Sequence, residues 1–264
     1  MTHLVSVVIP TRDSGKTIET CLKSVSAQTY HNVEVVVVDA HSTDNTIETA
    51  HEYGAKIFET GARRSQARNI GAEKAVGDLI LFLDADMQLN TTVIERGVDR
   101  IGDHCDAVII PETSVGESFW ARCKTLEKKC YIGDETIEGV RFLRKSVLES
   151  IGGYDNELEA GEDWDLSQRI VKAGYRIGRI NAFIIHHEGR LSLRDTVIKK
   201  HYYGKALERY QEKHPEESKR QLKLIRPAFV RNRKRLAKDP IHALGMFFMK
   251  TCEFVAGWIG SLEG

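Results

Sequence analysis

Apolar and polar residues follow one another along the first 190 positions as they do in a sheet with connecting helices. Short β-branched runs predict strands, and apolar residues recurring every three or four positions predict the helices between them. The runs at 33–38 and 79–83 have no polar face, which is typical of central strands covered on both sides. We therefore expect an α/β fold with a mostly parallel sheet. The predicted strands are 5–9, 33–38, 56–58, 79–83, 107–110, 140–143 and one or two within 176–185, and the predicted helices are 17–27, 46–53, 63–75, 91–101, 117–130, 145–150 and 162–173.

The remainder of the chain is predicted to be mainly helical, with a boundary near Gly189 between a domain over 1–189 and a C-terminal segment over 190–264. The last predicted helix, 240–262, has a wide apolar face, with Lys250 and Glu253 on a narrow opposite arc. Charges near the middle of a helix disfavour a bilayer-spanning role. The pattern favours a helix lying in a membrane interface, and packing on the domain's own core is the alternative.

The formal net charge is zero over 264 residues, but it conceals an asymmetry. Residues 1–189 hold 21 Lys/Arg and 30 Asp/Glu, whereas residues 190–238 hold 16 Lys/Arg and only 5 Asp/Glu. Basic stretches with aromatic residues can bind nucleic acid, and a charge run is often only a solvated helix face. Because an apolar helix follows the basic segment 190–238, we expect this segment to bind an anionic membrane surface and not nucleic acid.

Composition and cysteine usage narrow the class further. With 41% hydrophobic and 29% charged residues, the chain is an ordinary globular protein rather than a disordered tail, a fibre or a disulfide-stapled miniprotein. The five cysteines are an odd number without metal-finger spacing, which indicates free thiols in a reducing compartment. No signal-peptide pattern opens the sequence. We expect a peripheral protein on the cytoplasmic face of the cell membrane.

Three polar clusters follow predicted strands, at Pro10-Thr11-Arg12, at Asp39 and at Asp84-Ala85-Asp86. Ligands of open parallel sheets bind at the carboxyl ends of strands. A single Asp there is more often a helix cap or an Asx-turn, but three clusters on one edge indicate a ligand site. Asp84 and Asp86 can turn toward one hard cation, and Gln88 can add a carbonyl oxygen. Mg²⁺ or Mn²⁺ held in this way would neutralise a diphosphate leaving group.

The ordered set of motifs resembles the family 2 glycosyltransferases, which have the GT-A fold, over roughly residues 4–187. The resemblance implies a Rossmann-like, nucleotide-sugar-binding sheet with helices on both faces, followed here by a helical, membrane-associating segment. The segment DADMQ is also similar to that of dolichyl-phosphate mannose synthases. The matching motifs are SVVIPT (6–11), VVVD (36–39), STD (42–44), ARN (67–69) with Gly71, FLDAD (82–86), GGYD (152–155), GED (161–163), WDL (164–166) and KAGY (172–175).

The resemblance implies roles for individual residues. Arg68 would lie beside the nucleotide phosphates, where a forked guanidinium suits their geometry. Arg12 departs from the usual Thr-Tyr-Asn loop and is either an extra phosphate contact or a solvated arginine. The implied nucleotide-sugar pocket consists of Pro10, Thr11, Arg12, Asp39, Arg68, Asp84, Ala85 and Asp86. The implied metal ligands are Asp84, Asp86, Gln88 and His187, although a polar residue at a strand end such as His187 is more usually an ordinary one.

The pair Glu162-Asp163 opens a predicted helix, where spacing alone indicates only favourable N-terminal charges. By resemblance to inverting members, Asp163 is the general base that deprotonates the acceptor hydroxyl, and Glu162 lies next to the acceptor. The Gln-x-x-Arg-Trp segment of processive synthases is absent, and Gln168-Arg169-Ile170 stands there instead. This argues for transfer of a single sugar.

The expected activity is the inverting, metal-dependent transfer of one hexose from a UDP- or GDP-sugar to a membrane-associated acceptor, such as polyprenyl or dolichyl phosphate or a lipid-linked glycan. A soluble acceptor and a retaining mechanism remain alternatives. A sugar-phosphate nucleotidylyltransferase would need a Gly-rich N-terminal signature that is missing here. A non-enzymatic peripheral membrane adaptor would leave the carboxylates unused.

Overall fold

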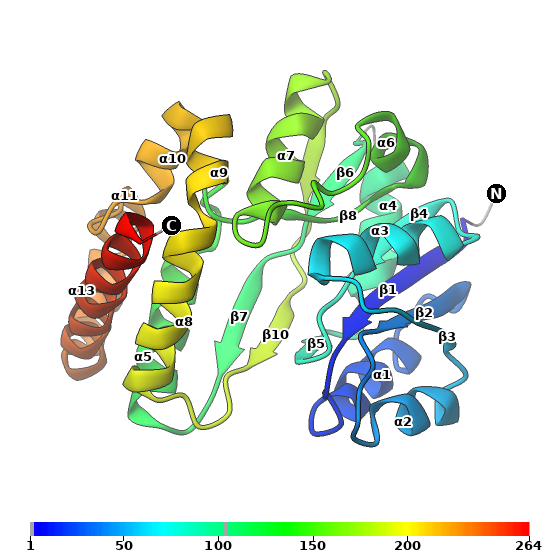
Figure 1. Cartoon of the computed structure of the whole chain (residues 1–264), viewed down its shortest axis with the longest axis horizontal. Helices are drawn as coiled ribbons and strands as arrows, with labels where there is room; N and C mark the ends of the chain where they lie inside the picture. The colour runs from blue at the N-terminus through cyan, green and yellow to red at the C-terminus, as the bar shows by residue number, and fades with distance from the viewer. Residues whose placement is uncertain (1–2, 103–104, 264) are drawn as a thin grey trace. The chain divides into compact units, whose positions relative to one another are not determined.

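The computed structural model describes residues 3–102 and 105–263 (Figure 1). The chain divides into two compact units. The first comprises residues 1–111, 139–157 and 162–185, and the second comprises residues 112–138, 158–161 and 186–264. Residues 112–138, which we expected to belong with the sheet, thus group with the C-terminal helices.

A seven-stranded mixed sheet forms the centre of the first unit. In spatial order its strands are β3 (Lys56–Glu59), β2 (Val33–Asp39), β1 (Val5–Thr11), β4 (Leu79–Phe82), β8 (Val140–Arg144), β6 (Ala107–Ile109) and β9 (Ile177–Arg179). The pairs β3–β2, β2–β1 and β1–β4 are parallel, as the βαβ pattern predicted. Beyond them, β8 lies antiparallel between β4 and β6. The sheet is therefore mixed: the N-terminal strands β3, β2, β1 and β4 are parallel to one another, and β6 and β9 form a further parallel pair.

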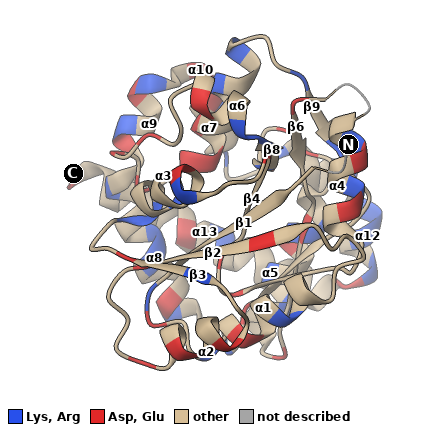
Figure 2. Cartoon of the chain, turned by 90° about the vertical axis from the view of Figure 1, so that its right-hand side faces the viewer, with Lys and Arg blue, Asp and Glu red and all other residues tan. Residues whose placement is uncertain are grey.

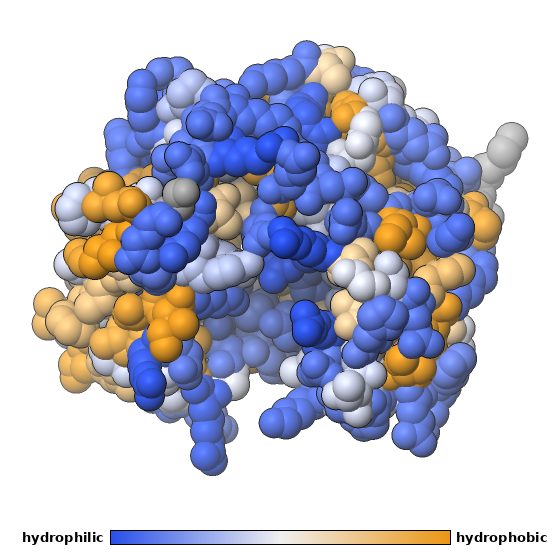
Figure 3. Space-filling view, viewed as in Figure 1, coloured by the Kyte–Doolittle hydropathy of each residue, from blue (hydrophilic) through white to orange (hydrophobic). Residues whose placement is uncertain are grey.

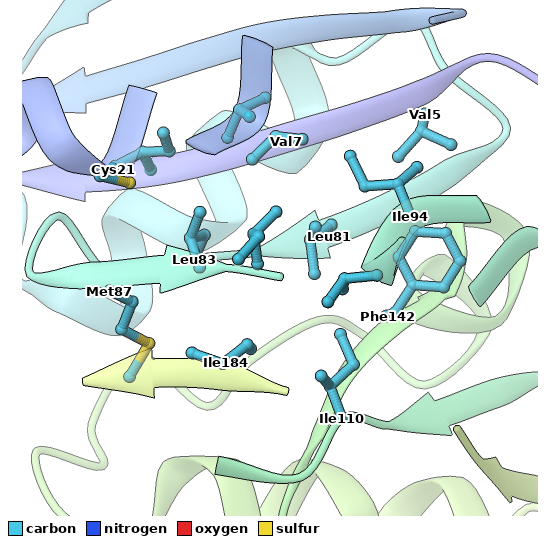
Figure 4. Close-up of a cluster of buried hydrophobic side chains, with 14 of the residues drawn as sticks. Val5, Val7, Cys21, Leu81, Leu83, Met87, Ile94, Ile110, Phe142 and Ile184 are labelled. Carbon is cyan, nitrogen blue, oxygen red and sulfur yellow. The ribbon is translucent and has the colours of Figure 1, made fainter. Parts of the chain in front are cut away.

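Apolar side chains cover both faces of this sheet, because alternate residues of each strand point to opposite sides. Val5, Val7 and Ile9 lie in a cluster with α1 (Ile18–Ser26), α2 (Thr46–Glu52) and α4 (Val93–Gly102). Figure 4 shows part of this cluster, with Cys21, Ile94 and Phe142 among the strand residues. Val8 lies in the opposite cluster with α3 (Arg64–Lys74), α6 (Lys145–Ser150) and α7 (Glu162–Lys172).

The predicted helices of both units are confirmed to within two residues at either end. Two short strands were not predicted, β5 (Met87–Leu89) and β7 (Glu112–Val115), because runs of three or four residues carry little periodicity. The predicted segment 176–185 contains β9 and the start of β10 (Ile184–His187), which begins in the first unit and ends in the second.

The second unit is mainly helical. Besides β7, it contains α5 (Phe119–Tyr131), α8 (Leu193–Ala206), α9 (Glu208–Lys213), α10 (Pro215–Gln221), α11 (Pro227–Arg231), α12 (Arg233–Lys238) and α13 (Pro240–Leu262). Helix α13 has the bounds predicted for the apolar segment and packs against α5 and α8. Within residues 3–102 and 105–263, no helix combines the length and the apolar content needed to cross a bilayer.

Helix α13 packs on its own unit through the arc that carries its charges. Lys250 and Glu253 are only 8% and 3% exposed, whereas Leu244 and Trp258 on the apolar face are 72% and 59% exposed. Glycines allow the close approach, since a Cβ atom added to Gly204 of α8 would lie 2.1 Å from the carbonyl oxygen of Gly257. Ala243, Met246 and Met249 are buried on the same side of the helix, so α13 turns a mixed apolar and charged face inward and leaves a second apolar face exposed.

Candidate functional site

The carboxyl ends of β1 and β2 bring two of the predicted pocket residues together. Thr11 and Asp39 are register partners at the ends of these parallel strands. The Thr11 hydroxyl donates a hydrogen bond of 2.7 Å to Asp39 Oδ1, and the backbone N–H and hydroxyl of Ser42 donate bonds of 2.7 and 2.6 Å to the same carboxylate. Asp39 is fully buried, whereas Arg12 is exposed and Pro10 is half-buried. The contacts of Asp39 within the chain are those of a turn-forming Asp, and its contact with a nucleotide stays a prediction.

Arg68 is the centre of the charged part of the site. Its side chain is 1% exposed, and its Nη2 lies 2.8 Å from Asp84 Oδ1 while its Nη1 lies 2.9 Å from Asp163 Oδ1. Glu162 Oε1 lies 3.4 Å from the same Nη1. One guanidinium thus joins the first carboxylate of the DAD motif to the predicted general base, although the two are 79 positions apart in the sequence.

Helix α3 can bring Arg68 to this point because Gly71 lets it lie close to the sheet. A Cβ atom on Gly71 would lie 2.3 Å from Val8 Cγ1. Next to Arg68, Asn69 accepts a hydrogen bond of 2.8 Å from the backbone N–H of Tyr154 and donates one of 2.9 Å to its carbonyl oxygen. The motif residues of α3 therefore position both Arg68 and the loop that carries Tyr154.

Tyr154 is a contact of the predicted base to which the sequence analysis assigned no role. Its hydroxyl donates a hydrogen bond of 3.0 Å to Asp163 Oδ1, and the Arg68 guanidinium lies 5.0 Å from the centre of its ring. The ring packs edge-on against Phe82, with 5.1 Å between centroids. A buried tyrosine held in this way fixes the orientation of the Asp163 carboxylate.

Arg141 is a second site residue that the sequence analysis missed. Its Nη2 lies 3.5 Å from Asp84 Oδ2 and 3.6 Å from Asp163 Oδ2. The antiparallel register that pairs Leu81 with Phe142 carries Arg141 to the end of β4, beside Asp84. The available signal was an arginine within the apolar run VRFL, since an unpaired arginine is rarely buried in a strand.

Burial and the neighbouring arginines have opposite effects on the pKa values of the acidic groups in this site. Burial by itself would raise the pKa of Asp84, but Arg68 and Arg141 outweigh it and hold that pKa well below its usual range. Burial, reinforced by the neighbouring Asp163 charge, instead raises the pKa of Glu162. Burial and the Asp163 charge also raise the pKa of Tyr154, which therefore stays a hydrogen-bond donor at neutral pH. The site thus combines a strongly ionised carboxylate, Asp84, with one that resists ionisation, Glu162.

Asp84, Asp86 and Gln88 follow β4, through a turn at 85–86 and into β5. All three are half-buried, whereas the intervening Ala85 and Met87 are buried and Met87 packs in the core. Among the described residues, no group of three or more His, Cys, Asp or Glu side chains converges as a metal cage would require. Mg²⁺ and Mn²⁺ are commonly bound by one or two carboxylates together with substrate phosphates. The chemistry of this oxygen donor set fits such a cation.

His187 belongs to the second unit, at the end of β10. It is exposed and helps to line a hollow of about 730 Å³ together with residues 115–118 and 189–191. Its role as a metal ligand stays a prediction.

Comparisons with known proteins define the class. The family model described as "Glycosyl transferase family 2" matches residues 6–152, and one described as "N-terminal domain of galactosyltransferase" matches residues 123–191. The chain is 30% identical over 204 residues to glycosyltransferase AglE of Haloferax volcanii, covering 70% of this chain and 67% of that protein. The chain is a glycosyltransferase, and thus a transferase enzyme. It belongs to glycosyl transferase family 2.

More distant relatives support the fold. Pre-mycofactocin glycosyltransferase of Mycobacterium tuberculosis is 25% identical over 243 residues, which cover 81% of this chain but only about half (49%) of that relative. A mannosyltransferase from Pyrobaculum calidifontis, solved with GDP-Man and Mn²⁺, has a TM-score of 0.70 at 18% identity and covers 99% of this chain and 88% of its own. S. aureus TarS 1-349, solved with UDP-GlcNAc, has a TM-score of 0.59 at 22% identity. The match covers 93% of this chain and 81% of the TarS chain. The mixed sheet with its flanking helices is thus the GT-A fold.

Proposed function

We propose that this glycosyltransferase transfers a single hexose, with inversion, from a nucleotide sugar to a membrane-associated acceptor such as a polyprenyl phosphate or a lipid-linked glycan. One observation carries the proposal: Arg68 lies within 3 Å of both Asp84 and Asp163. The residue proposed to serve the donor diphosphate and the residue proposed to serve the acceptor hydroxyl therefore meet on one buried cation. Inverting transfer needs both functions within reach of one carbon, on opposite faces of it, because the acceptor attacks opposite the departing diphosphate.

In the proposed reaction, Asp163 accepts the proton of the acceptor hydroxyl. The acceptor oxygen forms a bond to the anomeric carbon while the bond from that carbon to the diphosphate oxygen breaks, and the nucleoside diphosphate leaves with the electron pair. Tyr154 and Arg68 hold the Asp163 carboxylate in place. Glu162 lies beside Asp163 at the proposed acceptor end, and its raised pKa limits the negative charge there.

The proposed donor pocket combines Pro10, Thr11, Arg12 and Asp39 with Arg68 and the DAD motif. Arg141 joins this set because it reaches Asp84, and two guanidinium groups suit the charge of a diphosphate. We propose Asp84, Asp86, Gln88 and His187 as ligands of Mg²⁺ or Mn²⁺. The cation would supply charge neutralisation for the leaving diphosphate.

The comparisons leave the donor and acceptor open. The neighbouring solved structures carry GDP-Man in one case and UDP-GlcNAc in another. The names of the relatives point to different acceptors, pre-mycofactocin in one and 4,4'-diaponeurosporenoate in another. We propose a membrane acceptor because of the basic C-terminal segment and the outward apolar face of α13, and a cytoplasmic-face location because of the cysteine pattern.

The test is a panel of UDP- and GDP-sugars with Mg²⁺ or Mn²⁺ and two acceptor arms, polyprenyl phosphate and a set of water-soluble sugars. We expect lipid-soluble product from one donor, its loss on chelation with EDTA, and the inverted anomer by NMR. Product only in the soluble arm would replace the membrane acceptor. Retained stereochemistry would remove Asp163 from its role as base.

A non-enzymatic adaptor would give no product and would release no nucleoside diphosphate from any donor. It would also retain its function in an Asp163→Asn variant, whereas the enzyme would lose turnover and keep its fold.

A further inference from the structure

The outward face of α13 is a continuous apolar surface. We call it the apolar stripe, and it consists of Ile241, Leu244, Phe248, Phe254, Val255, Trp258, Ile259 and Leu262, which are between 41% and 72% exposed. Within Pro240–Leu262 no charged residue lies among them; Thr251 is an exposed polar residue on this face, and Ser261 and Glu263 lie at its C-terminal end. At 1.5 Å per residue the stripe runs for about 32 Å. Figure 3 shows apolar surface gathered where α13 lies in Figure 1.

The stripe is held outward by a ring of buried charges on the other side of the helix. Lys250 Nζ lies 2.9 Å from both Glu127 Oε1 and Glu253 Oε2, and Lys124 Nζ lies 2.8 Å from Glu127 Oε2 and 3.2 Å from Glu253 Oε1. Each cation therefore contacts both carboxylates, and the four charges cancel. Rotating α13 to bury its apolar stripe would expose this network to solvent and break it. The apolar face is thus built into the second unit.

Basic residues precede the stripe in the chain. Arg233, Lys234, Arg235 and Lys238 of α12 are all exposed, and Ile241 follows three positions later. Figure 2 shows the Lys and Arg positions of α12 in blue. Among the described residues, Lys234 and Lys238 have no carboxylate within ion-pair distance. Uncompensated positive charge beside an apolar helix face complements anionic lipid head groups above an acyl layer.

We propose that α13 docks on an anionic lipid bilayer, lying in its plane with the apolar stripe at the acyl boundary and the α12 bases at the head groups. The length of the stripe, its freedom from charge and the adjacent bases together favour a lipid surface over a protein partner. The inference deepens the proposed function, whose membrane acceptor is argued from the same face of α13, but docking itself requires neither donor nor acceptor.

The experiment is co-sedimentation of the full chain with vesicles of phosphatidylcholine alone and of phosphatidylcholine mixed with an equal amount of phosphatidylglycerol. We expect binding to the mixed vesicles that weakens as salt is added, because salt screens the head-group attraction. Leu244→Glu with Phe248→Glu should weaken binding roughly hundredfold, since two apolar side chains no longer leave water. Lys234→Gln and Lys238→Gln each remove one positive charge, and each should weaken binding to the mixed vesicles about fivefold.

The matched control is Ile225→Glu, which places the same charge on an apolar residue of the second unit that is 67% exposed but lies outside α13. It should bind vesicles like the wild type. Circular dichroism and urea unfolding of all variants check that the exposed substitutions leave the fold intact.

The proposal is overturned if the wild type sediments with neither vesicle, or if the double glutamate variant binds like the wild type. It is also overturned if light scattering shows a dimer that the double variant dissociates while vesicle binding is absent, because a second copy then covers the stripe. Since the assay contains no sugar nucleotide, failure to dock and failure to transfer hexose are separate results.

Discussion

The two units each bury a cluster of opposite charges, and the clusters differ in how far solvent reaches them. In the first unit, the side chains of Asp84 and Asp163 are both 25% exposed beside Arg68. In the second unit, those of Glu127 and Glu253 are both 2% exposed between Lys124 and Lys250. A ligand can reach the carboxylates of the first cluster, whereas the second is closed.

This difference in solvent access separates a candidate ligand site in the first unit from a purely structural ion-pair cluster in the second. In the second unit, Lys124 and Lys250 outweigh the effect of burial and hold the pKa of Glu127 well below its usual range, and the Tyr131 hydroxyl donates a further bond of 2.8 Å. Nothing in that ring is left to react. In the first unit, the arginines also hold charge, but part of the carboxylate surface stays open. Buried charge by itself therefore does not mark a functional site, whereas a buried cluster whose carboxylates stay partly accessible is a candidate for one.

The largest expected effect is on catalysis, from Asp163→Asn. Without a base at this position, kcat should fall by about 10²–10⁴-fold, while the amide keeps the size of the side chain. The measurement is the initial rate of product formation with the donor found in the panel. Asp165→Asn on the same helix is the contrast. Asp165 is fully buried and pairs with Arg169 at 2.7 Å, so this change should lower stability and leave kcat of the folded enzyme close to wild type. Equal losses of kcat would contradict the role of Asp163.

The closed ring should be the most sensitive point for folding. Lys250→Met leaves two buried glutamates with Lys124 as their one ion-pair partner in the ring, and the free energy of unfolding should fall by about 3–5 kcal/mol. Urea denaturation measures this change. Lys219→Met removes a lysine of an exposed pair, 2.7 Å from Glu216, and should change stability by less than about 1 kcal/mol. If both substitutions lower the free energy of unfolding equally, the ring of charges is not what stabilises the packing of α13.

Lowering the pH should change the contributions of Asp84 and Glu162 to stability in opposite directions. Because the pKa of Asp84 is lowered, its contribution to stability is present above the usual carboxyl range, about pH 4, and is lost as the pH falls below it. Asp84→Asn should therefore cost about 2 kcal/mol at neutral pH, and the difference from wild type should shrink in acid.

Because the pKa of Glu162 is raised, its ionisation costs stability as the pH rises through that value. Glu162→Gln should therefore raise the melting temperature at neutral pH and not in acid. Melting curves of both variants across the pH range test the pair, and a shift of the same sign in both would contradict this account.

The smallest expected effect concerns the fit of α7 against the sheet. A Cβ atom on Gly139 would lie 2.9 Å from Asp163 Cβ, so Gly139→Ala should displace the proposed base and lower kcat roughly tenfold with the fold retained. Gly102→Ala is the control, because among the described residues nothing beyond the adjacent backbone lies within 4 Å of the added carbon. Unchanged turnover in both variants would show that the position of Asp163 tolerates this shift.

Much of the fold and part of the candidate site could be predicted from local sequence patterns. The parallel strands and the helices between them follow from apolar runs and helical spacing, because both faces of the sheet are covered. The pairing of Thr11 with Asp39 follows from adjacent parallel strands ending at one edge. The family resemblance implied separate roles for Arg68 and Asp163, and their contact was not predicted, since no local pattern links positions so far apart.

Arg141 and Tyr154 show where sequence reasoning stopped. Arg141 reaches Asp84 only because β8 runs antiparallel to β4, and a short apolar run does not state its direction. Tyr154 reaches Asp163 because Asn69 of α3 holds its backbone. Both contacts depend on the register and packing of segments that are distant in the chain.

The sequence by itself determined that residues 240–262 form one helix with an apolar face and a charged arc, since both follow from residue spacing along a single segment. Only the tertiary structure decided which face turns inward. The deciding groups are Lys124 and Glu127, more than 120 positions from Glu253, which compensate the charges of α13 and make burial of the charged arc favourable. Spacing within a segment shows which residues share a face, but the partner that covers that face comes from elsewhere in the chain.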